Sequence, residues 1–441
     1  MTYALTNRFE SNDLKMGVIG LGYVGLPLSL EMARSGLEVL GFELNPDRVN
    51  DINDGRSHVV DVSDQELDEI LCTERFRATS EMHRMSECDA ISICVPTPLS
   101  KSHEPDMSYI LSASEMVSKS LRKGQLIVLE STSYPGTTQE AILPVLEQTG
   151  LEVGKDFFLC FSPERVDPGN KDWDIKNTPK VIGGITKDCL QVGRAVYERF
   201  VDELVLVSST EAAELVKILE NTFRAVNIAM VNEIALIADR LAVDIWEVVE
   251  AASTKPFGFM EFTPGPGFGG HCIPVDPQYL AWKMRGLNYR TRFVELASEL
   301  NAEMPKFLVE KVRSSLESKG ETLDGANIII IGVSYKRDVS DVRESPALQV
   351  IQELLSFGAK VEYHDPHVPE LLLSESLSLS SLALTDETLS QSDAVVIVTD
   401  HSSLDYSRIL NSSPILVDAR NATRFLSRDD KSVGESWVVK S

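Results

Sequence analysis

The sequence lacks any apolar stretch long enough to cross a membrane. Uninterrupted apolar runs such as Ile328–Ile331 are far shorter than the roughly 20 residues that a spanning helix requires. The first 14 residues also lack a basic segment followed by an apolar one, so we expect no secretory signal there and interpret them as a loose leader. These absences predict a protein with no membrane partner.

A surplus of basic residues is absent as well. The chain has 42 Lys and Arg against 67 Asp and Glu, which gives a net charge of −25. Proteins that bind nucleic acids need cations to replace the counterions around phosphates, so we expect no nucleic-acid partner. A small anionic ligand can still bind in a local basic pocket.

Paired cysteine spacings are also missing. None of the six cysteines belongs to a C-x-x-C pair, which argues against a disulfide framework and against a zinc site. We therefore expect reduced thiols, a cytoplasmic location and no bound metal.

What the sequence does contain is an alternation of short apolar strands and helices. It runs from residue 15 to 209 and again from 321 to 427, and such alternation predicts parallel sheets covered on both faces. The predicted fold class is α/β, with two Rossmann-like doubly wound domains joined by a long central helix. The predicted divisions are 15–209, 210–320 and 321–427 in a chain of 441 residues, a length that suits two or three domains.

The central region begins with residues 210–243, which have apolar side chains at helical spacing and no Gly or Pro. A helix of some 30 residues is longer than average and usually forms a spine between domains or subunits. Its apolar stripe would be poorly buried in a monomer, so we expect at least a dimer built on residues 210–245. A Gly/Pro-rich segment, 255–277, separates this helix from a second one over 294–318, and so long a loop is usually functional.

A glycine-rich turn, G-x-G-x-x-G, follows the first predicted strand and opens the first helix. Its glycines are Gly20, Gly22 and Gly25, and Glu43 ends the next strand. In a dinucleotide-binding turn the first glycine makes the bend, the second admits the pyrophosphate and the third lets the helix pack on the strand. The helix N-terminus then stabilises the diphosphate. Glu43 would accept hydrogen bonds from ribose hydroxyls, which favours NAD over NADP, although Arg48 could contact either the ribose or a phosphate.

Cys272 differs from the other five cysteines by lying in a glycine-rich loop, GGHCIPVDP (269–277). The other five are interpreted as small buried hydrophobic residues. A thiol beside a bound NAD can capture an aldehyde as a thiohemiacetal, which then loses a second hydride to give a thioester. For His271, a structural hydrogen bond is favoured over a role as the base of a Cys/His pair.

Seven segments of the chain form a specific series. In order they are GVIGLGYVGLPLSL near the start, VPTP (95–98), STSYPGTT (131–138), SPERVDPG (162–169), the K-x-x-x-N of Lys217 and Asn221, GFGGHCIPVDP (267–277) and GVSYKRDVSDVRESPAL (332–348). This series resembles the nucleotide-sugar 6-dehydrogenases, which include the UDP-glucose, UDP-N-acetylglucosamine and UDP-N-acetylmannosamine dehydrogenases. The resemblance covers about residues 16–420. It implies two NAD-dependent oxidations at C6 of a UDP-sugar, giving a uronic acid for surface polysaccharide synthesis.

The resemblance also implies roles for individual residues. Cys272 resembles the nucleophile, and Lys217 and Asn221 resemble the pair that stabilises the oxyanion. The residues that resemble groups that position water and move protons are Thr132, Glu164 and Asp276. Residues expected at the cofactor, besides the glycines and acid named above, are Tyr23, Val24, Arg48, Pro96, Thr97, Thr132 and Arg343. Residues expected at the substrate are Glu164, Arg165, Val166, Lys217, Asn221, Phe262, Gly265, Gly269 and Lys336.

Two departures bear on the substrate. The UDP-glucose branch has a lysine where this chain has Val275, and a second acidic residue where it has Pro168. Both departures favour a UDP-N-acetylhexosamine over UDP-glucose, but they do not distinguish the gluco, manno and galacto isomers. The GGHCIPVDP form most resembles the UDP-N-acetylglucosamine branch, so UDP-N-acetylglucosamine is the first choice, with the manno and galacto isomers and UDP-glucose as alternatives. A simpler hydroxyacid dehydrogenase, or a regulator that binds NAD or a nucleotide sugar without catalysis, also remains open.

Overall fold

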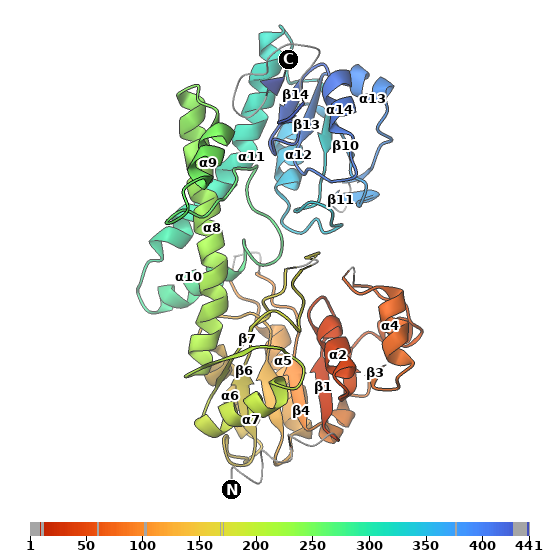
Figure 1. Cartoon of the computed structure of the whole chain (residues 1–441), viewed down its shortest axis with the longest axis vertical. Helices are drawn as coiled ribbons and strands as arrows, with labels where there is room; N and C mark the ends of the chain where they lie inside the picture. Colours follow the sequence, from red (N-terminus) through yellow and green to blue (C-terminus); the bar gives the residue numbers. More distant parts are fainter. Residues whose placement is uncertain are drawn as a thin grey trace. The chain divides into compact units, whose positions relative to one another are not determined.

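The computed structural model describes residues 9, 13–59, 61–100, 104–167, 169–170, 172–374 and 377–426, and the backbone of 439–440. Contacts divide the described chain into two compact units. The first contains the residues up to Glu220 together with Gln278–Tyr289, and the second contains Asn221–Pro277 and the residues from Arg290 onward. The long helix α8 (Thr210–Arg240) starts in the first unit and ends in the second (Figure 1). The three-part division expected from the sequence stays a prediction.

The first unit is built on an eight-stranded sheet in the order β3-β2-β1-β4-β5-β6-β7-β8. Its strands are β1 (Lys15–Ile19), β2 (Glu38–Phe42), β3 (Phe76–Thr79), β4 (Ala90–Ile93), β5 (Leu126–Leu129), β6 (Phe158–Phe161), β7 (Lys180–Gly184) and β8 (Leu204–Val207). The first six are parallel, which confirms the doubly wound fold. The expectation of a purely parallel sheet is wrong at β7, which runs antiparallel to β6. The described residues between these two strands form no crossover helix, and a parallel return would need one.

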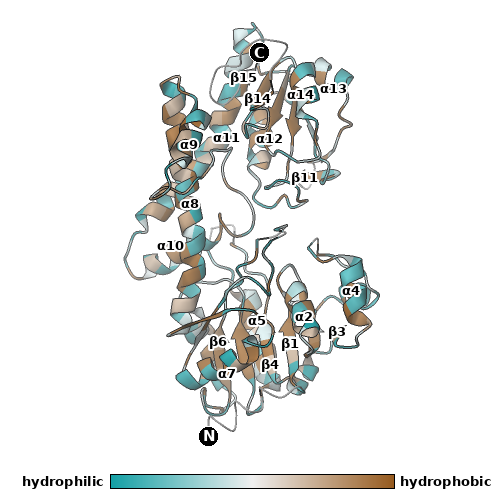
Figure 2. Ribbon diagram, in the orientation of Figure 1, coloured by the Kyte–Doolittle hydropathy of each residue, from teal (hydrophilic) through white to brown (hydrophobic). Residues whose placement is uncertain are grey.

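Helices of the first unit alternate with these strands. They are α2 (Gly25–Arg34), α3 (Pro46–Asn53), α4 (Asp64–Leu71), α5 (Ser108–Ser120), α6 (Leu143–Glu147), α7 (Lys187–Tyr197) and most of α10 (Asp276–Gly286). Local signals fix several starts: the Ser63 side chain accepts from the Glu66 amide in a capping box, and Thr186 caps α7. The central strands are hydrophobic throughout (Figure 2) and their side chains are buried, because helices cover both faces.

The second unit contains a five-stranded sheet in the order β10-β9-β13-β14-β15 and a hairpin, β11–β12. The strands are β9 (Asn327–Ile331), β10 (Lys360–His364), β11 (Glu370–Ser374), β12 (Leu377–Ser380), β13 (Ala394–Ile397), β14 (Leu416–Asp418) and β15 (Val439–Lys440). The first four strands of the sheet order are parallel, and β15 pairs antiparallel with β14. The helices are α9 (Ile245–Ser253), α11 (Arg292–Ser318), α12 (Pro346–Ser356), α13 (Asp386–Gln391) and α14 (Tyr406–Ser412). A second doubly wound domain is therefore confirmed.

Two helices of the central region were not expected. The helix α9 follows α8 after a short turn, and α10 begins at Asp276, inside the segment interpreted as a loop. The Gly/Pro-rich sequence before Asp276 hides this start, because its composition predicts only irregular structure. No helix in the described part of the chain combines the length and the apolar character that crossing a bilayer demands.

Candidate active site

The glycine turn of the first unit has the geometry that dinucleotide binding requires. Gly20 has φ +87°, and a Cβ on it would lie 2.8 Å from the Cys94 carbonyl oxygen. A Cβ on Gly25 would lie 1.9 Å from the Gly20 oxygen, so only glycine lets α2 pack this closely. A Cβ on Gly22 would meet nothing within 4 Å. The open side therefore lies at Gly22, beside the start of α2, where a diphosphate can approach the backbone.

Glu43 lies directly after β2, where the ribose of a dinucleotide would be held. One carboxylate oxygen accepts from the Asn45 amide at 3.0 Å, and the other is 3.5 Å from the Arg48 guanidinium. The Arg48 guanidinium therefore points toward the Glu43 carboxylate. Tyr23 is half exposed, and the Thr97 carbonyl accepts from Tyr279 Oη at 2.6 Å. Of the other expected cofactor residues in the first unit, Val24 and Thr132 are half-buried and Pro96 is exposed.

A buried network of charges surrounds Glu164, just beyond the end of β6. Its Oε1 accepts from the amides of Arg165 and Val166, each at 2.7 Å. Its Oε2 lies 3.3 Å from Lys180 Nζ, and that ammonium also lies 2.6 Å from Glu130. Burial opposes ionisation of Glu164, but Lys180, these amides and Lys217 outweigh it and hold the pKa of the carboxyl below its usual range.

Lys180 and Glu130 were missed by sequence reasoning. Lys180 is 3% exposed and Glu130 is 1% exposed. A signal was present, since both are charged residues at the ends of strands that are otherwise apolar. The Arg165 side chain, expected at the substrate, instead pairs with Glu220 at 2.6 Å. Lys217 is buried in the first turns of α8.

Cys272, Asn221 and Asp276 belong to the second unit. Asn221 Nδ2 donates to Asp276 Oδ2 at 2.6 Å, and both side chains are buried. The Asp276 amide donates to the Cys272 carbonyl at 2.8 Å, which closes a turn at the start of α10. The backbone of Cys272 is therefore tied to Asp276, whose side chain accepts from Asn221. Lys217 lies four residues before Asn221 in α8, one helical turn away.

The other cysteines are consistent with structural roles, with one exception. Four are buried, and burial raises the pKa of the Cys94 and Cys160 thiols and brings that of Cys88 to about 12. The interpretation as a buried residue is wrong for Cys72, which is exposed at the end of α4. Cys272 is half-buried.

The glycines before Cys272 are needed for packing. A Cβ on Gly269 would lie 2.7 Å from the Glu344 carbonyl oxygen, and one on Gly270 would lie 2.8 Å from the Tyr335 ring. The Gly270 amide donates to the Arg343 carbonyl at 3.0 Å. These glycines therefore let the cysteine loop pack against the segment after β9. That Gly269 also lies at the substrate stays a prediction.

A cavity of about 420 Å³ in the second unit contains two of the expected substrate residues, Phe262 and Gly265. Arg224 and Arg420 also line it, and neither was expected from the sequence. The Gly265 amide donates to the buried Asn232 side chain at 2.9 Å, which fixes the loop. A Cβ on Gly265 would lie 2.8 Å from the Arg420 guanidinium, so glycine leaves room for that group. Glu261 lines the cavity as well, so two guanidinium groups and one carboxylate lie beside the Phe262 ring, and the excess of positive charge suits an anionic ligand.

The last two expected residues lie in the loop after β9. Arg343 is bidentate with Asp341: Nε donates to Oδ1 at 3.0 Å and Nη2 donates to Oδ2 at 2.6 Å. The Lys336 carbonyl accepts from Ser334 Oγ at 2.8 Å, and its side chain is half-buried. Contacts within the loop therefore fix its conformation, and both Lys336 and Arg343 belong to this loop.

Comparison with known proteins gives these features a common origin. The models of the UDP-glucose/GDP-mannose dehydrogenase family match the chain in order: the NAD binding domain at 14–201, the central domain at 211–303 and the UDP binding domain at 329–425. The chain belongs to the UDP-glucose/GDP-mannose dehydrogenase family. The resemblance expected from the sequence is confirmed, and with it an oxidoreductase that uses NAD.

Individual relatives cover almost the whole dehydrogenase. A UDP-N-acetyl-D-glucosamine 6-dehydrogenase from Salmonella typhi is 34% identical over 89% of this chain and 91% of its own. A UDP-N-acetyl-D-mannosamine dehydrogenase from Pyrococcus horikoshii is 33% identical over 92% of this chain and 96% of its own. The structure of a UDP-D-ManNAc dehydrogenase from that organism matches with a TM-score of 0.85, 33% identity and coverage of 93% and 96%.

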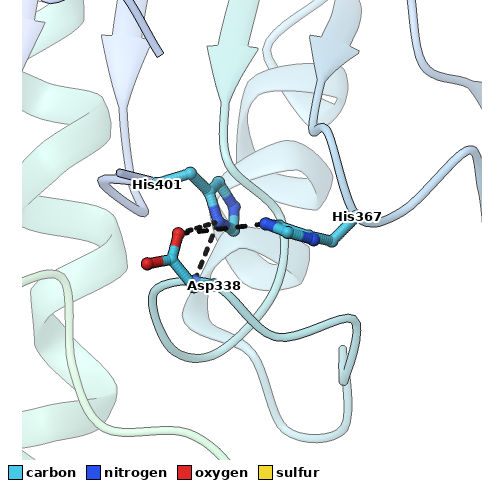
Figure 3. A group of neighbouring side chains, drawn as sticks. All are labelled: Asp338, His367 and His401. Carbon is cyan, nitrogen blue, oxygen red and sulfur yellow. Dashed lines mark hydrogen bonds and ion pairs between the residues drawn. The ribbon is translucent and has the colours of Figure 1, made fainter. Parts of the chain in front are cut away.

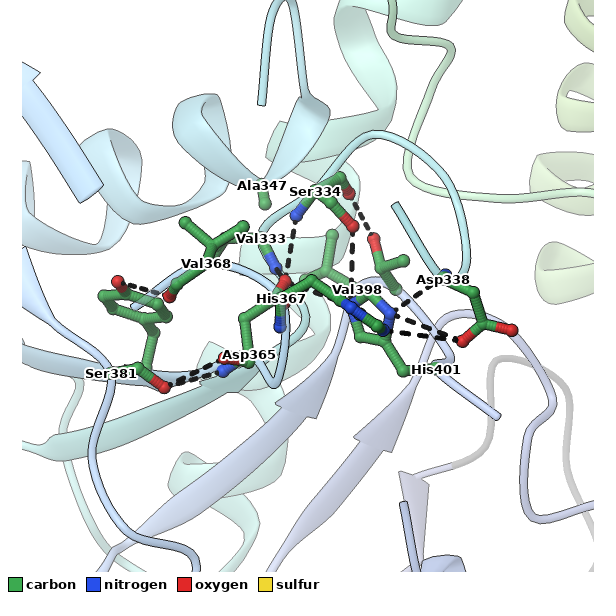
Figure 4. Close-up of polar contacts among 12 residues, drawn as sticks. Val333, Ser334, Asp338, Ala347, Asp365, His367, Val368, Ser381, Val398 and His401 are labelled. Carbon is green, nitrogen blue, oxygen red and sulfur yellow. Dashed lines mark hydrogen bonds and ion pairs between the residues drawn. The ribbon is translucent and has the colours of Figure 1, made fainter. Parts of the chain in front are cut away.

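One group of side chains in the described part of this dehydrogenase is close enough to hold a cation (Figure 3). Asp338, His367 and His401 lie after three parallel strands, with their ligand atoms within 4.8 Å of one another. However, the Asp338 amide donates to His401 Nδ1 at 3.1 Å, and His401 Nε2 lies 3.0 Å from Asp365 Oδ2 (Figure 4). Nδ1 must therefore accept and Nε2 must carry the proton. A cation would have to displace the Asp338 amide, so this arrangement supports the loop, and the expectation of no bound metal stays a prediction.

Proposed function

We propose that this enzyme oxidises the C6 hydroxyl of a UDP-N-acetylhexosamine to a carboxylate, with two NAD⁺ and one water consumed per sugar. The observation that supports the proposal is the backbone hydrogen bond that ties Cys272 to Asp276, together with the bond from Asn221 to the Asp276 carboxylate. A simple alcohol dehydrogenation needs no thiol, whereas oxidation to the acid needs a nucleophile that keeps the aldehyde bound.

When bound, NAD⁺ accepts a hydride from C6 in each of the two oxidations. The Cys272 sulfur forms a bond to C6 of the aldehyde, and the resulting thiohemiacetal becomes a thioester in the second oxidation. Water then attacks C6, the C–S bond breaks, the thiolate leaves and the carboxylate is released. The balance is one alcohol, two NAD⁺ and one water to one carboxylate, two NADH and three protons.

The chain's polar groups have separate parts in these steps. Lys217 and Asn221 donate to the oxyanion that forms on the C6 oxygen when sulfur or water attacks. Asp276 accepts from one amide proton of Asn221 and thereby orients the other. Glu164 and Thr132 hold the attacking water, and a carboxylate suits that task because it only accepts hydrogen bonds.

The substrate class rests on the departures from the UDP-glucose pattern and on the relatives. Val275, which is buried, replaces a lysine of that branch, and the other departure, Pro168, lies outside the described residues. Relatives at 33–36% identity are named for N-acetylated glucosamine and mannosamine and for an N-acetylgalactosaminuronic acid. UDP-N-acetylglucosamine is the first choice because the GGHCIPVDP sequence is most like that branch.

The test is a panel of UDP-glucose, UDP-N-acetylglucosamine, UDP-N-acetylmannosamine and UDP-N-acetylgalactosamine, read by NADH absorbance. We expect two NADH per sugar and a uronic acid product. One NADH per sugar with a free aldehyde would refute the four-electron reaction. Cys272→Ser should stop before acid release, whereas Cys72→Ser, at an exposed cysteine, should keep full activity.

We also propose that α8 forms a dimer interface. Large apolar side chains recur along it at spacings of three, four or seven residues and are 42–64% exposed: Leu215, Leu219, Phe223, Met230, Ile234 and Ile237. This spacing places them on one face of the helix. A second copy of the same helix is the partner that an apolar seam of this kind fits.

A further inference from the structure

Lys180 occupies an unusual place for a lysine. It is the first residue of β7 and only 3% exposed, with its ammonium 2.6 Å from Glu130 and 3.3 Å from Glu164. Because β7 runs antiparallel to β6, its first residue lies at the edge of the sheet where the parallel strands end. That is the edge at which doubly wound sheets bind their ligands.

Glu130 and Glu164 are both buried against the ammonium of Lys180, and Lys217, which is also buried, is the other cation that acts on Glu164. The side chains of Glu130 and Glu164 are 0% and 13% exposed. Two buried carboxylates near one another cannot both stay ionised without a cation, because burial and mutual repulsion both favour the neutral acid. Tyr197 Oη donates to Glu130 and thereby completes its hydrogen bonds.

We infer that Lys180 is a positioning residue that keeps Glu164 ionised and fixes the orientation of its carboxylate. This inference rests on the function proposed for Glu164 above. With Oε1 held by two backbone amides and Oε2 by Lys180, the carboxylate cannot rotate. Glu164 then acts as a fixed acceptor for water or a substrate hydroxyl across the whole working pH range.

The groups that face this cluster come from five elements. Lys180 lies on β7, Glu130 follows β5, Tyr197 ends α7 and Lys217 lies on α8. Cys94, after β4, is electrostatically coupled to Glu130 and Lys180. Arg165 is paired with Glu220. Of these charges, Lys180 has the largest effect on Glu164, so its removal should dominate any change.

The test measures kcat/KM against pH, from pH 5 to 9, for the full-length wild type, Lys180→Gln and Glu130→Gln. Removing the ammonium raises the pKa of Glu164, so Lys180→Gln should lose activity as the pH falls. The acidic limb of its profile, where kcat/KM falls with decreasing pH, should lie at least about one pH unit above that of the wild type. Removing a neighbouring carboxylate has the opposite effect, so Glu130→Gln should move the limb to lower pH or out of the range.

Opposite shifts separate positioning from a merely structural role, because general loss of structure would affect both variants alike. Tyr197→Phe is the matched control, since it removes a hydrogen bond and leaves all three charges, and its limb should not move. An unshifted limb in Lys180→Gln, or shifts of the same sign in both single variants, would overturn the inference. A wild type that forms no NADH would instead refute the proposed function.

Lys180→Gln can fail to fold, because it removes the one ammonium that contacts both buried carboxylates. The double variant E130Q/K180Q keeps the net charge and the hydrogen-bonding capacity of the pair. Since Lys180 outweighs Glu130 at Glu164, its acidic limb should still move to higher pH, by less than in the single variant. A limb in the wild-type position in this folded double variant would equally refute the inference.

Discussion

Asp365 provides the sharpest test of how the second unit is held together. It lies directly after β10, is 3% exposed, and accepts from the amides of Val333 and Ser334 at 2.7 and 3.1 Å (Figure 4). It also accepts from the His367 amide at 2.8 Å and from His401 Nε2 at 3.0 Å. One carboxylate therefore anchors the loop after β9 to the ends of β10 and β13.

Replacing Asp365 by alanine leaves two fully buried backbone donors, the Val333 and Ser334 amides, without an acceptor, and leaves His401 Nε2 with only the Ser334 hydroxyl at 3.4 Å. Each unsatisfied buried donor costs about 1–3 kcal/mol, so we expect a loss of about 4 kcal/mol from the stability of this unit. Asp365→Asn keeps one acceptor oxygen and should lose about half as much.

The stability of the second unit alone can be measured by amide hydrogen exchange in the peptide that covers β9 and the loop after it. A loss of about 4 kcal/mol corresponds to exchange roughly a thousandfold faster. Asp405→Ala is the control in the same unit, because this residue only caps α14, and its removal should cost about 1 kcal/mol. Exchange in Asp365→Ala no faster than in this control would refute the reasoning.

The stabilisation by Asp365 also has a definite pH dependence. Burial alone would raise its pKa, but the hydrogen bonds to His401 and to backbone amides outweigh it and hold the pKa below its usual range. The pKa of Asp365 is therefore lower in the folded protein than in the unfolded chain, where it is about 3.9. Its ionised carboxylate stabilises the fold fully above that unfolded pKa, and this stabilisation is lost as the pH falls through the folded pKa. The difference between wild type and Asp365→Asn should therefore persist at pH 5–8 and shrink below pH 4.

Three further predictions concern the other regions. Gly25→Val should abolish NAD binding and lower the melting temperature, since even a Cβ would lie 1.9 Å from the Gly20 oxygen; unchanged NAD affinity by calorimetry would contradict the close packing of this turn. Glu43→Lys should weaken the binding of NAD by about tenfold or more and favour NADP, because a cation would then face the 2′-phosphate. The measurement is the ratio of the kcat/KM values for the two cofactors. Ile234→Glu, on the exposed stripe of α8, should convert a dimer to a monomer by light scattering, and a wild-type monomer at micromolar concentration would remove the dimer proposal.

Local sequence determined much of the first unit. The turn from Gly20 to Gly25 was identifiable because Gly20 and Gly25 meet steric demands that no other residue meets, while Gly22 leaves the backbone open. Glu43 followed from its place after the second strand. The long helix was equally plain, since 31 residues without Gly or Pro carry a helical pattern. Cys272 stood out through its loop. These inferences are local, and the physics that fixes them acts within a few residues.

The tertiary structure decided how distant residues are combined. Sequence spacing cannot reveal that β7 turns antiparallel, yet that reversal is what carries Lys180 to the edge of the sheet beside Glu164. The two domains also use equivalent acids differently. Glu43, after β2, has a partly exposed carboxylate, whereas Asp365, after β10, is buried and fully engaged by its own loop. Both are acids that end the second strand of a doubly wound domain, and only the surrounding donors, brought in from remote segments, decide whether such an acid faces a ligand or the protein.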